Sequence, residues 1–331
     1  MPLASARTAS LTPLANGWTW VDVPQSNCDD GSPTGYGVNQ GTGPDLVIYF
    51  QGGGACWDAT TCLVDRQSAH GPFGRTQFAT GIPALGGSIL DRSVTGNPFA
   101  TATLVYIPYC TGDLHAGNNV ASYVNPGTGA TVSYRHVGHA NAMAFLSSIA
   151  ATWPAPRRLV IAGSSAGGYG ALMNYASFRA AFHAGTSYLI DDSGPPLPNG
   201  LLSQTILTDL YANWNLGALL DPQCNCRNGF LPLLSELVAT YPVDHMSLLS
   251  SEQDDVIRAY YQLTPAQFTL AIQQATVEVM KPTPNARYFL VPGDSHDMLA
   301  SPALFAQGIP LTTWLSQQLI DDPSWIDEAP P

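Results

Sequence analysis

The sequence predicts an α/β fold built on a mainly parallel sheet with helices on both faces. Short apolar runs, as at Asp45–Phe50, Leu104–Pro108 and Leu159–Ala162, are typical of strands buried on both faces. Segments with helical periodicity, such as Gly138–Trp153, lie between such runs, and this alternation is the pattern of a parallel sheet covered by helices. With 331 residues and 45% hydrophobic content, the chain can build one large core, and we expect a single domain over residues 1–331.

The other elements follow in order along the chain. We expect an edge strand over Trp18–Val23 that ends at Pro24, because proline cannot donate to a strand ladder. Polar and glycine-rich stretches at 27–43 and 58–99 read as long loops. Later strands are expected at Tyr188–Ile190, Met246–Ser250 and Arg287–Pro292, and later helices at Pro265–Val279 and Leu311–Leu319.

Residues 195–245 interrupt the alternation of strands and helices. This segment contains prolines, turn signals and short helical patches. Ligands of open α/β sheets bind beyond the carboxyl ends of the strands. We therefore expect 195–245 to be an insertion within the domain that caps a site at that edge.

Cysteine content indicates the compartment. Six cysteines, an even number mostly in predicted loops, favour three disulfides and an oxidising environment. They are Cys28, Cys56, Cys62, Cys110, Cys224 and Cys226. Cys56 and Cys62 are expected to close a short loop, whereas Cys224 and Cys226, one residue apart, are expected to reach different partners. We predict a secreted protein, extracellular or periplasmic, whose signal peptide is absent from this chain because residues 1–10 lack an apolar core.

Charge and hydropathy restrict the partners. The chain has 24 acidic and 12 basic residues, a net charge of −12, which disfavours nucleic acid and anionic membranes as ligands. No run of about 18 apolar residues occurs, so no membrane span is expected.

The stretch Arg158–Tyr175 carries the clearest functional signal. An apolar run leads directly into Gly163–Gly167 (GSSAG), and an alanine-rich helical pattern follows. A strand, a G-x-S-x-G turn and a helix form the nucleophile elbow of α/β-hydrolases. The sharp turn strains the backbone at Ser165 and lifts its hydroxyl clear of the sheet. The sequence therefore predicts an α/β-hydrolase fold with Ser165 as the nucleophile.

A serine nucleophile needs a base and an acid that orients the base. In α/β-hydrolases they follow in the order serine, acid, histidine. Here Asp254 and Asp255 end a later strand, and His296 follows the last strand. We predict Asp254 as the acid, because it lies two residues before the first buried positions of the next element, with Asp255 as the alternative. Asp191 and Asp192 also end a strand, and we expect them to organise the turn before the insertion.

Three glycines directly after a buried strand suggest the oxyanion hole. We predict that the amides of Gly54 and Ala55, with that of Ala166, face the developing oxyanion. Trp57 and His115 follow strand ends and are candidate substrate contacts, although a structural role fits each equally well. The two glycine-rich phosphate-binding motifs, G-x-G-x-x-G and G-x-x-x-x-G-K-[ST], do not occur in the sequence. No spacing of histidine, cysteine or acidic residues typical of a metal site stands out either, so no cofactor and no metal are expected.

Together these motifs resemble the pectin acetylesterase/Notum-like family of secreted α/β-hydrolases. The matching segments are a GGG-x-C loop at Phe50–Cys56, a YC-x-G segment at Ile107–Gly112, GSSAGG at Gly163–Gly168, and the acid and base positions Asp254 and His296. The resemblance implies a serine hydrolase that removes acyl groups from hydroxyl oxygens, with the oxyanion amides at Gly54, Ala55 and Ala166. Many members have tryptophan in place of Ala55 and cysteine in place of Ser164, which marks this chain as a divergent, bacterial member.

The predicted function is a secreted carboxylic ester hydrolase that works through an acyl-enzyme, best on short acyl groups such as acetyl. Its ester substrate would be a small molecule or carried on a polymer such as a polysaccharide. A polyester depolymerase or a lipase-like hydrolase would use the same triad and is the alternative. A peptidase and a non-enzymatic binding protein on this scaffold are further alternatives, and the predicted triad argues against the last.

Overall fold

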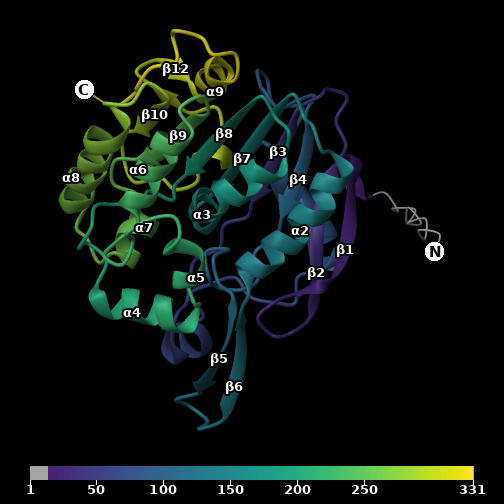
Figure 1. Cartoon of the computed structure of the whole chain (residues 1–331), viewed down its shortest axis with the longest axis vertical. Helices are drawn as coiled ribbons and strands as arrows, with labels where there is room; N and C mark the ends of the chain where they lie inside the picture. Colours follow the sequence, from purple (N-terminus) through teal and green to yellow (C-terminus); the bar gives the residue numbers. More distant parts are fainter. Residues whose placement is uncertain (1–13, 331) are drawn as a thin grey trace.

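The computed structural model describes residues 14–330, and within them one large sheet forms the centre of the molecule (Figure 1). Eight strands of the described chain lie in the order β1-β2-β4-β3-β7-β8-β9-β10. Their bounds are β1 Trp18–Asn27, β2 Pro33–Asn39, β3 Leu46–Phe50, β4 Thr103–Ile107, β7 Arg158–Ser164, β8 Thr186–Asp192, β9 His245–Ser251 and β10 Ala286–Val291. From β4 to β10 all neighbours are parallel, and only β1 and β2 are antiparallel to their neighbours. The predicted α/β fold with a mainly parallel sheet is confirmed.

Helices cover both faces of this sheet. Their bounds are α1 Arg75–Gly81, α2 Gly138–Thr152, α3 Ala166–Ala181, α4 Gln204–Asn213, α5 Gly217–Leu220, α6 Leu231–Thr240, α7 Asp255–Tyr260, α8 Pro265–Ala275 and α9 Leu311–Leu319. Successive residues of β7 point to opposite faces. Leu159 and Ile161 pack into one core with α2, α3, α4, α6 and α8, whereas Val160 and Ala162 pack into another with α1 and α9. A central strand buried on both faces explains why its sequence is continuously apolar.

The first third of the chain differs from the prediction. β1 continues past Pro24 to Asn27, because the register shifts between Val23 and Asn27 and the proline falls within that irregularity. The expected loop at 27–43 contains β2. Its glycines read as loop signals, but a Cβ at Gly37 would lie 2.2 Å from the Phe78 ring, so glycine is required there for close packing. The expected loop at 58–99 contains α1, and a hairpin of β5 (Asn119–Val124) and β6 (Thr131–His136) was not predicted.

Of the segment 195–245, residues 195–244 lie outside the sheet, and His245 begins β9. They contain α4, α5 and α6, and α6 contacts α3 directly (Figure 1). Buried apolar residues of this segment, including Leu207, Leu220 and Leu234, join the same core as α3. The segment is therefore packed onto the α3 face of the sheet.

All six cysteines are paired. The pairs are Cys28–Cys110, Cys56–Cys62 and Cys224–Cys226. The second pair was predicted. The expectation that the last two cysteines reach different partners is wrong, because the chain bends so that their Cα atoms lie 5.3 Å apart, which is within the ordinary range for a disulfide.

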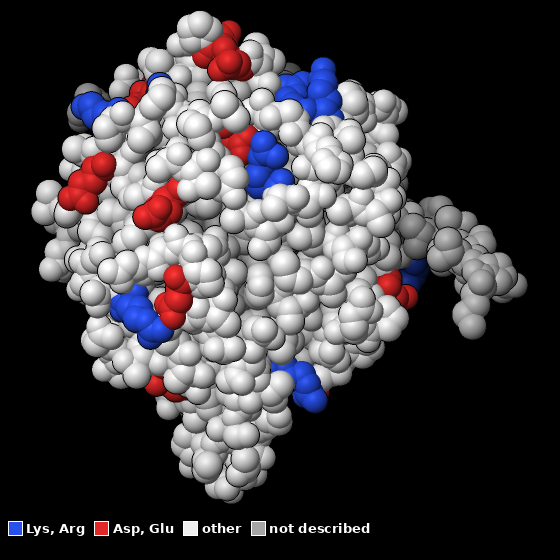
Figure 2. Space-filling view, in the orientation of Figure 1, with Lys and Arg blue, Asp and Glu red and all other residues white. Residues whose placement is uncertain are grey.

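The surface carries few charged groups. Figure 2 shows acidic and basic side chains scattered singly or in small groups, with wide uncharged areas between them. Within residues 14–330, no helix has both the length and the apolar character needed to cross a membrane. The prediction about a signal peptide falls on residues 1–10, which lie outside the described residues.

The disulfides should differ in their contribution to stability. Cys28 and Cys110 are 82 residues apart, whereas Cys224 and Cys226 are 2 apart. From the entropy of loop closure we expect the Cys28→Ala/Cys110→Ala variant to lose about 4.5 kcal/mol of unfolding free energy, and the Cys224→Ala/Cys226→Ala variant about 1.5 kcal/mol. Denaturant unfolding of both variants measures the difference, and equal losses would show that loop length does not govern these bridges.

Candidate active site

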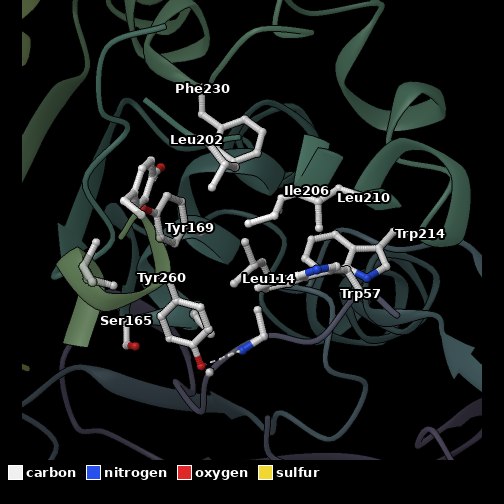
Figure 3. Close-up of a pocket in the computed structure, with 15 residues that line it drawn as sticks. Trp57, Leu114, Ser165, Tyr169, Leu202, Ile206, Leu210, Trp214, Phe230 and Tyr260 are labelled. Carbon is white, nitrogen blue, oxygen red and sulfur yellow. Dashed lines mark hydrogen bonds between the residues drawn. The ribbon is translucent and has the colours of Figure 1, made fainter. Parts of the chain in front are cut away.

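Ser165 stands at the tight turn between β7 and α3. Its backbone has φ 58° and ψ −123°, a strained conformation for a residue with a side chain. The turn is so tight that a Cβ at Gly163 would lie 2.1 Å from the carbonyl oxygen of Gly167, and a Cβ at Gly167 would lie 1.9 Å from that of Phe50. Only glycine fits at both positions. The predicted elbow is therefore present, with Ser165 lining a cavity above it (Figure 3).

Asp254 and His296 are brought together from the ends of β9 and β10. The Nδ1 atom of His296 lies 2.8 Å from Oδ2 of Asp254. The other carboxylate oxygen caps α7, where it accepts the amides of Val256 at 3.1 Å and Ile257 at 2.9 Å. Asp254 is completely buried, and both of its carboxylate oxygens are held by hydrogen bonds. The alternative acid, Asp255, is an exposed residue in the first turn of α7.

The charge state of His296 depends on several carboxylates. Burial by itself would lower the pKa of His296, but the hydrogen bond with Asp254 and the negative charges of Asp297 and Asp192 outweigh it and raise the pKa above its ordinary value. Nε2, the ring atom that would face a nucleophile, lies 3.3 Å from Oδ1 of Asp297. The ring is thus oriented through Nδ1 and tuned by charge at Nε2.

The buried carboxylate of Asp192 joins the serine turn to the histidine loop. Its Oδ2 accepts the hydroxyl of Ser164 at 2.6 Å and the amide of Leu299 at 2.9 Å. Its Oδ1 accepts the amide of Met298 at 2.9 Å. Its backbone carbonyl accepts the amide of Ser165 at 2.7 Å. Asp192 therefore organises more than the turn that the sequence assigned to it, and the signal that pointed to it was its place at a strand end.

The predicted oxyanion residues Gly54, Ala55 and Ala166 line the same cavity as the serine. The amide of Ala55 donates to the hydroxyl of Tyr260 at 3.3 Å, as the dashed line in Figure 3 shows. That hydroxyl in turn donates to the carbonyl of Gln67 at 2.8 Å. A substrate oxyanion at the Ala55 amide would therefore take the place of the Tyr260 hydroxyl. Nothing in the sequence indicated Tyr260, which lies at the end of a short helix.

The cavity beside Ser165 is strongly apolar. Aliphatic and aromatic side chains from α3, α4, α7 and the surrounding loops point into it (Figure 3). They are Trp57, Leu114, Tyr169, Leu202, Ile206, Leu210, Trp214, Phe230, Ile257, Tyr260 and Tyr261. Trp57, which the sequence offered as a candidate substrate contact, lines this cavity.

His115 has a different position. It is 2% exposed and its Nε2 lies 2.9 Å from the carbonyl oxygen of Gln51, beneath the glycine loop. Burial lowers the pKa of His115 to about 4, so it is neutral at physiological pH. His115 therefore supports the glycine loop from behind and does not line the cavity, so the candidate substrate contact is wrong for this residue.

The sequence predicted no metal site, but the described residues contain one group of candidate metal ligands. Cys56, Cys62 and His136 lie close enough together to hold an ion. The two cysteines form a disulfide and therefore offer no thiolate. This group does not fit a metal ion.

The fold and the elbow define an α/β-hydrolase. The model of the family described as pectinacetylesterase matches residues 15–205. The chain belongs to this family, which is a family of serine carboxylesterases.

Sequence identity between this chain and individual relatives is low. The chain is 28% identical over 155 residues to the palmitoleoyl-protein carboxylesterase NOTUM of Homo sapiens, a match that covers 44% of this chain and 28% of the relative. It is 26% identical to notum2 of Xenopus laevis, over 50% of this chain and 33% of the relative. The chain thus matches only about a third or less of these relatives' length. The solved structure of the Wnt deacylase Notum from Drosophila has the same fold, with a TM-score of 0.64 at 18% identity over 96% of this chain and 95% of that chain.

Asp192 should act as a positioning residue. Asp192→Asn replaces one acceptor oxygen by an NH₂ group that faces donors, so we expect kcat/KM to fall at least about tenfold and the unfolding free energy to fall by about 2 kcal/mol. The neighbouring buried Asp191 makes none of the Asp192 hydrogen bonds, and Asp191→Asn is the matched control that should retain activity. Equal effects of the two substitutions would contradict the role of Asp192.

The acid limb of the pH profile should report His296. With His296 as the predicted general base, its ring must be neutral to accept a proton. We therefore expect activity to be lost as the pH falls through the pKa of His296, with this limb above the ordinary value of 6.5. Asp297→Asn removes a negative charge near Nε2 and should move the limb to lower pH. Asp294→Asn, an exposed position on the same loop, is the control. A limb that stays in place in Asp297→Asn would show that this charge does not act on the base.

Proposed function

We propose that the chain is a serine carboxylesterase with Ser165, His296 and Asp254 as its triad. The observation that carries the proposal is a strained serine that lines an apolar cavity, while hydrogen bonds to Asp192 join its turn to the loop that follows His296. Ser165 attacks the ester carbonyl while His296 accepts its proton, and Asp254 stabilises the resulting imidazolium. The amides of Gly54, Ala55 and Ala166 stabilise the oxyanion. His296 then protonates the departing alcohol, and a water molecule releases the acyl group by the reverse sequence.

The cavity suggests the class of acyl group. Eleven aliphatic and aromatic side chains line it, and almost none of its lining is polar. An acetyl group has a single methyl to place among these side chains, so the lining favours a longer acyl chain than the acetyl that the sequence favoured. We propose acyl chains of several carbons, because each buried CH₂ contributes about 0.8 kcal/mol. The palmitoleoyl-protein carboxylesterases among the relatives point in the same direction, and a lipid acyl group carried on a protein is the second candidate substrate.

Residues 195–245 act in this proposal as a cap over the acyl group. Leu202, Ile206, Leu210, Trp214 and Phe230, which form much of the apolar wall, all come from this segment. We propose that the cap sets chain-length preference, while the sheet supplies the triad.

Secretion also remains part of the proposal. Three disulfides support an oxidising compartment, extracellular or periplasmic. Such a location would give the enzyme access to esters on polymers or proteins outside the cell.

Kinetics with p-nitrophenyl esters test the reaction and the chain length together. We expect kcat/KM to rise about fourfold per added CH₂ from acetyl towards hexanoyl. Ser165→Ala should lose at least about a thousandfold in kcat/KM and should no longer be labelled by a fluorophosphonate. Ser235→Ala, a serine on α6 away from the cavity, should behave as the unmodified chain.

A cap substitution separates the two claims. Ile206→Trp narrows the cavity and should abolish the preference for longer chains while acetyl ester hydrolysis is retained. Full activity of Ser165→Ala would contradict the proposed reaction at this serine. An unchanged chain-length profile in Ile206→Trp would contradict only the proposal that the cavity binds the acyl chain.

A further inference from the structure

A second groove, with walls of mixed polarity, adjoins the active-site cavity. Trp57, Ile206 and Tyr260 line both spaces and separate them. On the far side of these three residues the groove is lined mainly by residues with polar side chains, among them Asp58, Gln67, Asp209 and Gln262. We call this space the outer groove. An ester with its apolar acyl group in the cavity has to place its alcohol half outside it, and the outer groove is the adjoining, more polar space.

The charge of the outer groove has one sign. Asp58 and Asp209 both line it, and the described residues along its walls include no lysine, arginine or histidine. Oδ1 of Asp58 is held by Thr61, whose amide and hydroxyl donate to it at 2.7 and 3.0 Å. Partial burial raises the pKa of Asp209, and the charge of Asp58 raises it further, so the two carboxylates act on the same space. A cation in the groove would relieve this repulsion.

Two of the three residues that separate the groove from the cavity are aromatic. The rings of Trp57 and Tyr260 meet edge to face with their centres 6.3 Å apart, and both side chains are only partly buried. Aromatic faces attract cations, most strongly for tryptophan. Carboxylates beside partly exposed aromatic rings are a combination that favours an ammonium group over a neutral or anionic one.

Building on the proposed esterase function, we propose that the outer groove binds the alcohol half of the substrate and selects alcohols that carry a positive charge. Asp58 and Asp209 would be the specificity-determining residues. The same charges would repel an anionic alcohol, so esters on acidic sugar polymers would be poor substrates.

Butyrate esters with matched alcohols test this selection. We would compare kcat/KM for the choline ester, for its uncharged 3,3-dimethylbutyl isostere and for an anionic 3-sulfopropyl ester. We expect the choline ester to exceed the isostere by about tenfold at low ionic strength and the anionic ester to be the slowest. The ratio should shrink in about 0.5 M salt, because the carboxylates are partly exposed.

The double variant Asp58→Asn/Asp209→Asn provides the reference for intrinsic reactivity. Choline is a better leaving group than its isostere, so the informative quantity is the change in the ratio between variants. We expect the ratio to fall at least about fivefold in the double variant and by a smaller factor in Asp209→Asn alone, since the Asp209 carboxylate accepts no hydrogen bond from the described residues. Glu236→Gln removes a negative charge on α6, outside the groove, and should leave the ratio unchanged.

Failure of the proposed alcohol selection and failure of the proposed esterase function give different results. An unchanged ratio in the double variant, with the neutral ester still hydrolysed, overturns the inference and leaves the esterase proposal intact. If neither the neutral ester is hydrolysed nor Ser165 labelled by a fluorophosphonate, both are overturned.

Discussion

The carboxylate of Asp192 holds together two segments that are more than a hundred residues apart. It is completely buried at the end of β8, and it accepts the Ser164 hydroxyl on one side and the amides of Met298 and Leu299 on the other. A buried carboxylate is costly unless it is fully hydrogen-bonded, so this corner is stable only when both segments are in place. Burial, and the nearby charge of Asp297, raise the pKa of Asp192 to about 7. The serine turn and the histidine loop are thus positioned by a single polar centre beneath them.

Around this centre the molecule separates two environments. The apolar cavity is lined by α3, α4, α7 and the loops around them, whereas the outer groove has more polar walls and two acidic residues. Tyr260 lies at the boundary, and its hydroxyl accepts the amide of Ala55. In the proposed complex an ester would extend across both environments, because its acyl group is apolar and its alcohol half is polar. The proposed division of the substrate follows from this contrast.

Much of the site could be predicted from sequence because it depends on local rules. The elbow at Ser165 requires glycines at fixed positions, and Asp254 and His296 follow strand ends in the order the fold imposes. The role of Asp192 required knowledge of which loop lies over it. Tyr260 carries no sequence signal at all. β2 was missed because Gly37 is needed for packing against Phe78 rather than for a turn, and the Cys224–Cys226 bridge was missed because it depends on a local bend of the chain.

We propose that Ser165, His296 and the apolar cavity form one reaction site. A crystal structure of the protein after reaction with a hexylphosphonate ester tests this most directly. We expect phosphorus bonded to Oγ of Ser165, Nε2 of His296 within hydrogen-bond distance of the adduct, and the alkyl chain among Leu202, Ile206 and Leu210. An unmodified serine, or an adduct with the alkyl chain in solvent and the His296 ring turned away, would contradict this proposal.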